Sequence, residues 1–165
     1  MYVPGQTPFV LVSAMDGRAV KGKSDTDSFV EMWSLDFNDE SQQWVQVLGN
    51  QYINLQSLLP LYAGTGRAWT YDDEMKRVVD VVNPGKALDR GWAQWDGAFV
   101  HTYDLHLLGP EQFMKLPLSI TEFVNGKYVN FWTGNQFQGI LLNLKKLFIA
   151  QIFHKSKFSV NWQVA

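Results

Sequence analysis

Apolar and polar residues alternate in short runs along most of the chain, and turn-forming residues separate these runs. Within residues 29–35, Phe29, Glu31 and Trp33 fall on one side of an extended chain and the residues between them fall on the other. Such a period of two predicts β-strands. Phe9–Ala14 is a more continuous apolar run, which also predicts a strand because Gly17 ends the turn that follows it.

The pattern of residues 28–47 recurs in degraded form at 98–116 and 147–164. In each copy a Phe is followed by a second ring fourteen or fifteen residues later, and these pairs are Phe29 with Trp44, Phe99 with Phe113, and Phe148 with Trp162. A shorter element with the order Gly, basic, Ala or aromatic, aliphatic, polar precedes each copy. Three copies predict an all-β body with pseudo-threefold symmetry, whose core contains Trp44, Phe113 and Trp162.

At this length one domain over residues 1–165 is expected. Its predicted lobes are approximately 8–50, 78–117 and 118–165. The repeat is least clear in residues 51–77, which we interpret as the end of lobe one and a long excursion, because a closed threefold body has no room for a fourth lobe. Residues 139–155 fit helical spacing as well as strand spacing, and the strand interpretation is the one that preserves the repeat.

Composition and charge narrow the classes of function. The net charge of −2 gives no general attraction to polyanions, so neither nucleic acid nor an anionic membrane is an expected main partner. The chain has no Cys, so disulfides and cysteine-ligated metals are excluded. His101 and His106 would face opposite sides of one strand, and the third histidine, His154, lies in another lobe. We therefore expect no metal site and no cofactor.

Targeting and catalytic motifs are also missing from the sequence. The first ten residues have neither the basic nor the apolar part of a secretory signal, which favours a cytoplasmic protein or one exported without a classical signal. No apolar stretch is long enough to span a bilayer, so membrane insertion is not expected, although 139–155 leaves a membrane-active amphipathic segment as an alternative. No Gly-x-Ser-x-Gly elbow or phosphate-binding loop occurs, and we expect no enzyme.

Two groups of residues resemble a known family. SQQWVQV at 41–47 has the Gln-x-Trp motif, and GKALD at 85–89 is followed at 97–104 by Gly-Ala-Phe-Val-x-x-Tyr-Asp. Both are similar to the ricin B-chain type β-trefoil, the Gln-x-Trp lectin domain. The resemblance covers about two thirds of the chain. It implies a β-trefoil fold with shallow sugar-binding pockets, up to one per lobe, and no catalysis.

The resemblance also implies which residues bind a sugar. In lobe two, Asp89 stands at the position of the pocket Asp and Tyr103 at the position of the stacking ring. His101 is a hydroxyl partner, Trp92 lies in the adjoining loop, and Glu111 occupies the place of an Asn-Gln pair. This lobe is the first choice for a pocket.

Lobe one departs further from the family pattern. It keeps an aromatic at the stacking position, Trp33, but has Lys21 where the family has Asp, so Asp25 or Glu31 would have to replace the missing carboxylate. Lobe three lacks these groups, with Asn130 and Ile152 at the corresponding positions. We therefore expect no pocket in lobe three.

The sequence thus favours a lectin that recognises glycans or glycoproteins through an Asp and an aromatic ring. Such shallow sites bind single sugars weakly, so several lobes or a homo-oligomer would supply avidity. The alternative is a β-trefoil protein-binding module, such as a protease inhibitor or a toxin-complex component, that acts through loops at 50–77 and 131–139.

Overall fold

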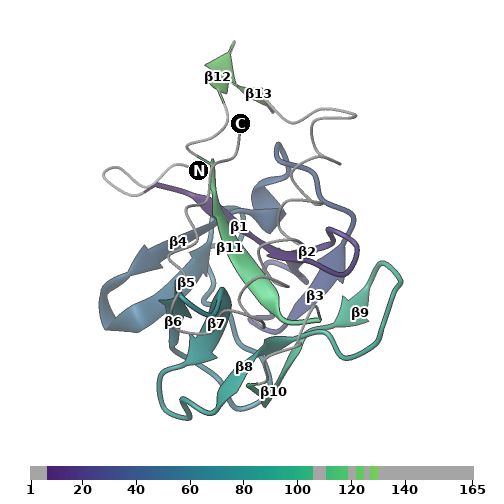
Figure 1. Ribbon diagram of the computed structural model, residues 1–165. Coiled ribbons are helices and arrows are strands. Elements are labelled where there is room, and N and C mark those ends of the chain that lie inside the picture. The colour runs from purple at the N-terminus through teal and green to yellow at the C-terminus, as the bar shows by residue number, and fades with distance from the viewer. Residues whose placement is uncertain (1–6, 106–110, 119–121, 125–126, 130–165) are drawn as a thin grey trace.

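The fold is seen in a computed structural model, in which the structure describes residues 7–105, 111–118, 122–124 and 127–129 (Figure 1). Within these residues the regular elements are strands and two short 3₁₀ turns, η1 (Glu40–Gln42) and η2 (Leu48–Asn50). The strands are β1 (Phe9–Ser13), β2 (Ala19–Gly22), β3 (Val30–Trp33), β4 (Trp44–Val47), β5 (Gln51–Asn54), β6 (Trp69–Asp72), β7 (Arg77–Asp80), β8 (Lys86–Asp89), β9 (Ala98–Phe99), β10 (His101–Asp104), β11 (Phe113–Pro117), β12 (Glu122–Val124) and β13 (Lys127–Val129). The all-β prediction is confirmed.

The first strands form where the pattern of apolar residues predicts them. β1 is buried at all five positions, as its apolar run requires, and β3 alternates between buried and half-buried side chains. Between β1 and β2 the chain reverses through Gly17, whose φ of 80° is readily adopted by glycine and disfavoured for other residues. β3 therefore has one side toward the core, whereas β1 is covered on both sides, with Phe9 and Leu11 in one core cluster and Val10 and Val12 in another.

Three strand pairs repeat around the molecule and close it. β4 pairs with β5, β6 pairs with β7, and β11 pairs with β1, all antiparallel. In each pair a buried ring stands opposite a buried polar residue: Trp44 opposite Asn54, Trp69 opposite Asp80, and Phe113 opposite Ser13. Because β11 returns to β1, three units related by pseudo-threefold symmetry close on themselves within residues 9–117.

The three rings lie in one core cluster, and each is at most 1% exposed. The indole N–H of Trp44 donates to the carbonyl oxygen of Val20 at 3.2 Å, and that of Trp69 donates to the carbonyl oxygen of Leu61 at 2.9 Å. The prediction that Trp44 and Phe113 are core rings is confirmed. Trp69 is the third ring of this core, and Trp162, which was expected there, lies outside the described residues.

The polar residues opposite these rings all have the same local role. Ser13 Oγ accepts the backbone N–H of Met15 at 3.3 Å. Asn54 Oδ1 accepts that of Gln56 at 3.1 Å, and Asp80 Oδ1 accepts that of Val82 at 3.0 Å. Each side chain therefore satisfies the turn that follows its own strand, which explains why a polar residue is buried at this point of every unit.

Residues 51–77 belong to the body of the molecule and are not the excursion that the sequence suggested. They contribute β5 and β6, which pair with β4 and β7. Between Leu55 and Ala68 the described chain forms isolated bridges instead of a strand equivalent to β3 or β10. This unit is therefore shorter than its two neighbours.

Several expectations concern residues outside the described part of the chain. The third predicted lobe, 118–165, is described only at Leu118 and in β12 and β13, which pair with each other. The helix or strand alternative for 139–155, and the membrane-active segment proposed there, also lie outside the described residues. These expectations stay predictions.

Candidate functional site

Two hairpins present matching sets of side chains on their outer faces. In the β2–β3 hairpin Lys21 stands opposite Glu31 and Ala19 stands opposite Trp33. In the β8–β10 hairpin Asp89 stands opposite His101 and Ala87 stands opposite Tyr103. The alternate residues Val20 and Leu88 are fully buried in the core, so the matched sets face away from it. The structure thus brings together Asp89, His101 and Tyr103 in one hairpin, and Glu31 and Trp33 in the other.

In the β2–β3 hairpin a cation, a carboxylate and an indole lie in contact. The N–H of Trp33 donates to Glu31 Oε1 at 2.8 Å, and Lys21 Nζ lies 4.9 Å from the centroid of the Trp33 ring. Lys21 also pairs with Asp39 at 3.3 Å. Burial raises the pKa of Asp39, but hydrogen bonds from Ser41 and the charge of Lys21 outweigh it and hold that pKa below its usual value.

In the β8–β10 hairpin the carboxylate is buried and the ring is exposed. Asp89 is 1% exposed, and its two oxygens accept the backbone N–H of Gly91 and the side-chain amide of Gln112. Tyr103 is 55% exposed, and His101 is half-buried with Nδ1 3.1 Å from the carbonyl oxygen of Thr102. Asp89 therefore supports the turn that begins the following loop, and direct contact of this carboxylate with a sugar would require rearrangement.

The remaining predicted site residues are not part of these two sets of paired side chains. Asp25 is exposed in the loop between β2 and β3, and Trp92 is 75% exposed in the loop formed by residues 90–97. Glu111 is 4% exposed, and its backbone carbonyl accepts the N–H of Arg90 at 3.1 Å. The structure therefore places Glu111 beneath the surface, where direct contact with a sugar would require rearrangement.

Loop 90–97 is fixed to the first unit by ion pairs that the sequence did not reveal. The buried guanidinium of Arg90 donates to Asp16 and, through Nε at 2.9 Å, to the carbonyl oxygen of Ala93. At the other end of the loop, Asp96 Oδ1 accepts Arg18 Nε at 3.0 Å and the backbone N–H of Ser34 at 2.8 Å. These partners are far apart in sequence, so no local motif indicates them.

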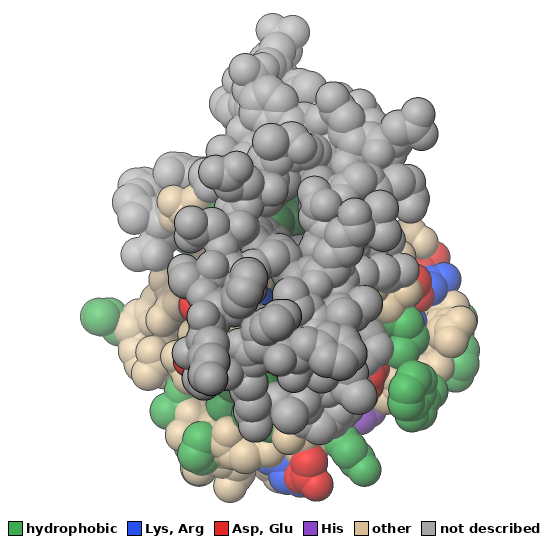
Figure 2. Space-filling model, viewed as in Figure 1, with side chains coloured by type: hydrophobic (Ala, Val, Ile, Leu, Met, Phe, Trp, Pro, Cys, Tyr) green, Lys and Arg blue, Asp and Glu red, His purple; other side chains and the backbone are tan. Residues whose placement is uncertain are grey.

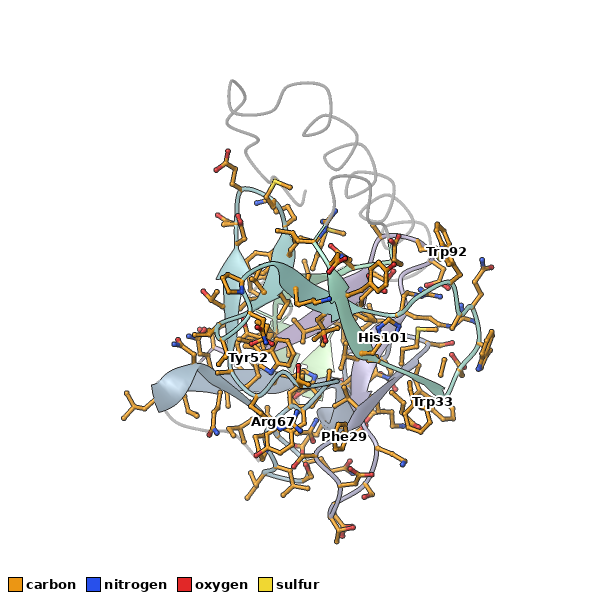
Figure 3. All side chains as sticks on the ribbon, turned by 90° about the horizontal axis from the view of Figure 1, so that it is seen from below. Phe29, Trp33, Tyr52, Arg67, Trp92 and His101 are labelled. Carbon is orange, nitrogen blue, oxygen red and sulfur yellow. The ribbon has the colours of Figure 1, made fainter. Side chains whose placement is uncertain are left out.

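The fixed loop holds its aromatic side chains in solvent. Trp92 and Trp95 are 75% and 64% exposed. Figure 2 shows hydrophobic side chains protruding from the described surface, and Figure 3 places Trp33, His101 and Trp92 on the same side of its view. The loop then continues into β9, which pairs with β3 so that Phe99 stands opposite Glu31. β9 therefore adds a third strand to the face that carries Trp33.

The described part of the chain contains neither a metal-binding cluster nor a membrane-spanning helix. Among the described residues, no group of three His, Asp or Glu side chains could hold a metal ion. None of the helices described is long and apolar enough to cross a membrane.

Comparison with known proteins identifies the fold. No protein-family model matches the sequence, and no curated protein matches it. Among solved structures, the C-half of an earthworm R-type lectin in complex with GalNAc is 15% identical, with a TM-score of 0.54 over 67% of this chain and 98% of that chain. The designed threefold symmetric protein ThreeFoil is 22% identical, with a TM-score of 0.54 over 66% of this chain and 97% of that chain. The chain therefore has the β-trefoil fold, as predicted.

A fungal lectin of the same fold extends the comparison. The Rhizoctonia solani agglutinin is 11% identical, with a TM-score of 0.53 over 71% of this chain and 98% of that chain. In all three comparisons nearly the whole of the other chain matches about two thirds of this one. Because the identities are so low, the likeness establishes the fold alone.

Proposed function

We propose that this protein is a non-catalytic lectin that binds glycans on the outer faces of its hairpins. The observation that carries the proposal is the repeated arrangement of an accessible ring beside polar side chains, with Tyr103 in one hairpin and Trp33 in the other. The likeness to structures of lectins supports it, since an earthworm lectin was solved with GalNAc and a mutant of its C-terminal domain with 6'-sialyllactose.

The chemistry of the two faces suits a sugar. A pyranose ring presents C–H groups on one face, which pack on an exposed aromatic ring, and hydroxyl groups at its edge. Tyr103 offers such a ring beside His101, whose imidazole exchanges hydrogen bonds with hydroxyls. Trp33 offers a second ring between Lys21 and Glu31, which supply a charged donor and a charged acceptor. We place the first pocket at Tyr103 and His101, with the buried Asp89 supporting the turn beside it, and the second at Trp33.

A glycan array compares the wild-type protein with Tyr103→Ala, Trp33→Ala and the double variant. Loss of one stacked ring removes about 1–2 kcal/mol, so each single variant should bind roughly tenfold more weakly and the double variant should lose detectable binding. Asp89→Ala should also weaken binding, and because Asp89 is buried its thermal unfolding is measured in parallel.

Phe29→Ala is the matched control, because Phe29 is also a partly exposed ring but lies beside Tyr62 and Arg67, outside both faces. We expect this variant to bind like the wild type. An array on which the wild-type protein binds no glycan, or on which the double variant binds unchanged, contradicts the proposal.

A second candidate function is protein binding through loop 90–97. The observation that favours it is the pair of exposed rings, Trp92 and Trp95, on a loop held by ion pairs at both ends. Trp is enriched among the residues that dominate protein interfaces. A pull-down from a deglycosylated protein mixture tests it. Capture that free sugar does not compete, and that is lost in a Trp92→Ala, Trp95→Ala double variant, supports protein binding, whereas capture that sugar abolishes contradicts it.

A further inference from the structure

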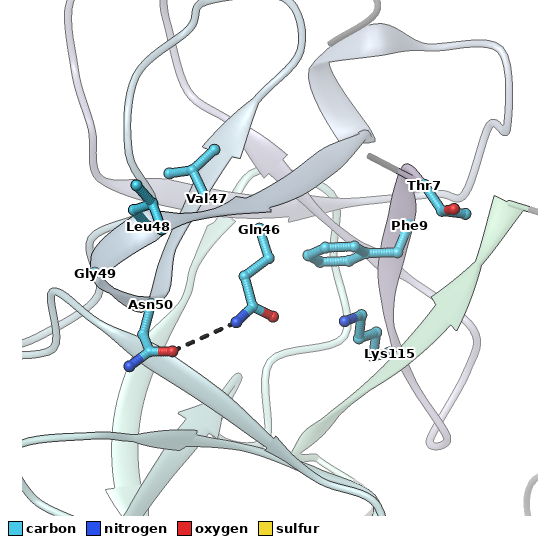
Figure 4. A pocket seen from close by; sticks show the side chains of 8 residues that line it. All are labelled: Thr7, Phe9, Gln46, Val47, Leu48, Gly49, Asn50 and Lys115. Atoms are coloured by element: carbon cyan, nitrogen blue, oxygen red, sulfur yellow. Dashed lines mark hydrogen bonds between the residues drawn. The ribbon is translucent and has the colours of Figure 1, made fainter. Parts of the chain in front are cut away.

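A cavity lies at the other end of the barrel from the β1–β2 turn. It has a volume of about 650 Å³ and opens beside the start of β1 and the end of β4 (Figure 4). Phe9, Gln46 and Lys115 line it, together with residues of η2. Small-molecule sites in proteins have volumes of about 300–1,000 Å³, so this cavity is large enough for a ligand.

The fold places a polar layer just below the core rings. Gln46, Tyr71 and Lys115 each follow a core ring by two residues, in β4, β6 and β11 respectively. Side chains two apart on a strand point to the same side, so these three point to the core side of the barrel. The threefold repeat thus brings an amide, a phenol and an ammonium to the same level.

Lys115 is the one cation of this layer. Its Nζ lies 4.4 Å from the centroid of the Phe9 ring and 5.9 Å from that of Tyr52. Burial lowers the pKa of Lys115, and no carboxylate of the described residues contributes to that shift. The two rings compensate the charge in part, and an anion in the cavity would compensate it more fully.

Two further polar groups near Lys115 have weak or missing partners. The hydroxyl of Tyr52 is buried and has no hydrogen-bond partner among the described residues. The side-chain amide of Gln46 donates to Asn50 at 3.4 Å, which is longer than the usual N–H···O distance of about 2.7–3.2 Å. Figure 4 shows Gln46 and Lys115 pointing toward one another beside the Phe9 ring. The amide and the hydroxyl can each donate or accept a hydrogen bond, and the positive charge of the ammonium suits an anion.

We propose that this cavity binds a small monocarboxylate with an apolar body, with Lys115 as the counter-ion. One cation matches one negative charge, and the Gln46 amide is a second donor for the carboxylate. The apolar body packs on the ring of Phe9, which lies beside Lys115 in the cavity. The cavity and the hairpin faces use different residues, so this proposal does not depend on the lectin function.

To test the proposal, the full chain is titrated with benzoate and with hexanoate, and binding is monitored by ¹⁵N–¹H NMR. The neutral amides of both acids test the need for charge, and inorganic phosphate tests the need for an apolar body. We expect the carboxylates to shift the amide signals of Val47, Gly49 and Lys115. Loss of the charged hydrogen bond in Lys115→Met should weaken their binding by about ten- to a hundredfold.

Lys86→Met is the matched control. Lys86 is an exposed lysine of β8 that forms an ion pair with Asp104 and does not line the cavity. It should bind both probes like the wild type, and the neutral amides should bind the wild type at least about tenfold more weakly than the acids do. If Lys115→Met does not fold, the titration is repeated with Gln46→Leu, which should also lower the affinity for both acids.

Three results would overturn the proposal. In the first, neither acid shifts the cavity signals at millimolar concentration. In the second, the folded variant at Lys115 or Gln46 binds the acids as tightly as the wild type. In the third, phosphate shifts the same signals as strongly as benzoate, which would show general anion attraction without a site for an apolar body.

Discussion

At the scale of single residues, equivalent positions in the three units of the trefoil carry different types of side chain. Two residues before Ser13, Asn54 and Asp80 stand Leu11, Tyr52 and Val78, all fully buried. Two of these are apolar. Their partners across the strands are Lys115, Gln46 and Tyr71, so Tyr52 brings a further hydroxyl to the polar layer described above. That hydroxyl has no hydrogen-bond partner among the described residues, and burial raises its pKa far above the usual value.

This isolation predicts the effect of Tyr52→Phe. The substitution keeps the ring that packs edge-on against Phe9 at 4.8 Å and removes a buried group that makes no hydrogen bond. We expect the free energy of unfolding to rise by about 1 kcal/mol, measured by urea denaturation. A loss of stability would mean that the hydroxyl has a bound partner, such as a water molecule. Tyr62→Phe, at a half-buried tyrosine outside this layer, is the control.

At the scale of elements, the loop 90–97 is held in place by the carboxylates of Asp16 and Asp96. Burial raises the pKa of Asp16, but hydrogen bonds from Arg90 and Arg18 outweigh it and hold that pKa below its usual value. The pKa of Asp96 is likewise lowered against the effect of burial, by Arg18 and Ser34. Both ends of the loop are therefore fixed by ionised carboxylates.

The sign of these shifts predicts how the loop responds to acid. A carboxylate whose pKa is lower in the folded state stabilises the fold above its unfolded pKa, near 3.8, and this stabilisation is lost as the pH falls through the folded value. We therefore expect Trp fluorescence, to which the exposed Trp92 and Trp95 contribute, to stay constant down to about pH 4 and to change below it.

Asp16→Asn is the control for this acid transition. It removes one of the two titrating groups, so stability at neutral pH should fall and the remaining transition should be smaller. If the fluorescence change is identical in the variant, Asp16 does not hold the loop.

The sequence predicts the elements of the first unit well and those of the second poorly. β1 and β3 form within one or two residues of the runs that predict them, because each run is bounded by Gly or by polar residues. In the second unit the turn is made by Leu58, whose φ is 63°, where a glycine would have signalled a turn. Trp69 follows Arg67 and Ala68 and so lacks the Gln-x-Trp signal, and no third strand separates it from Leu61.

The candidate site was also predicted only in part from the sequence. Alternation within residues 29–35 was enough to place Glu31 and Trp33 on a common face, whereas Asp89 and Tyr103 were assigned to one pocket through the resemblance to the Gln-x-Trp lectin domain. The burial of Glu111 and the contact of Arg90 with Asp16 depend on segments that meet only in the folded chain. A single sequence contains no local signal for such contacts.

At the scale of the whole molecule, closure occurs well before the end of the chain. β11 pairs with β1 over five residues, and Leu118 then donates its N–H to the carbonyl oxygen of Pro8 at 2.9 Å. Leu118 is 2% exposed and packs with Val10, Val12, Phe37 and Leu116 in a second core cluster. All three core rings, and all three pairs of strands that join the units, lie before this point.

We therefore expect a chain that ends at Leu118 to fold without residues 119–165. Its urea denaturation should be cooperative, and its near-ultraviolet circular dichroism should keep the signals of the buried Trp44 and Trp69. A chain ending at Gly109, which lacks β11, is the control and should not fold. An unfolded chain in the first case would show that later residues complete the core.

The short second unit limits the number of sugar-binding faces that one molecule can have. Only the first and third units of the described barrel possess the hairpin with a ring and polar groups on its outer face, because the chain between Leu55 and Ala68 lacks a third strand. If the proposed lectin function holds, a single molecule would therefore bind its target at two points. Particles that carry two copies of the sugar would be joined end to end into strings, and branched networks would require targets of higher copy number.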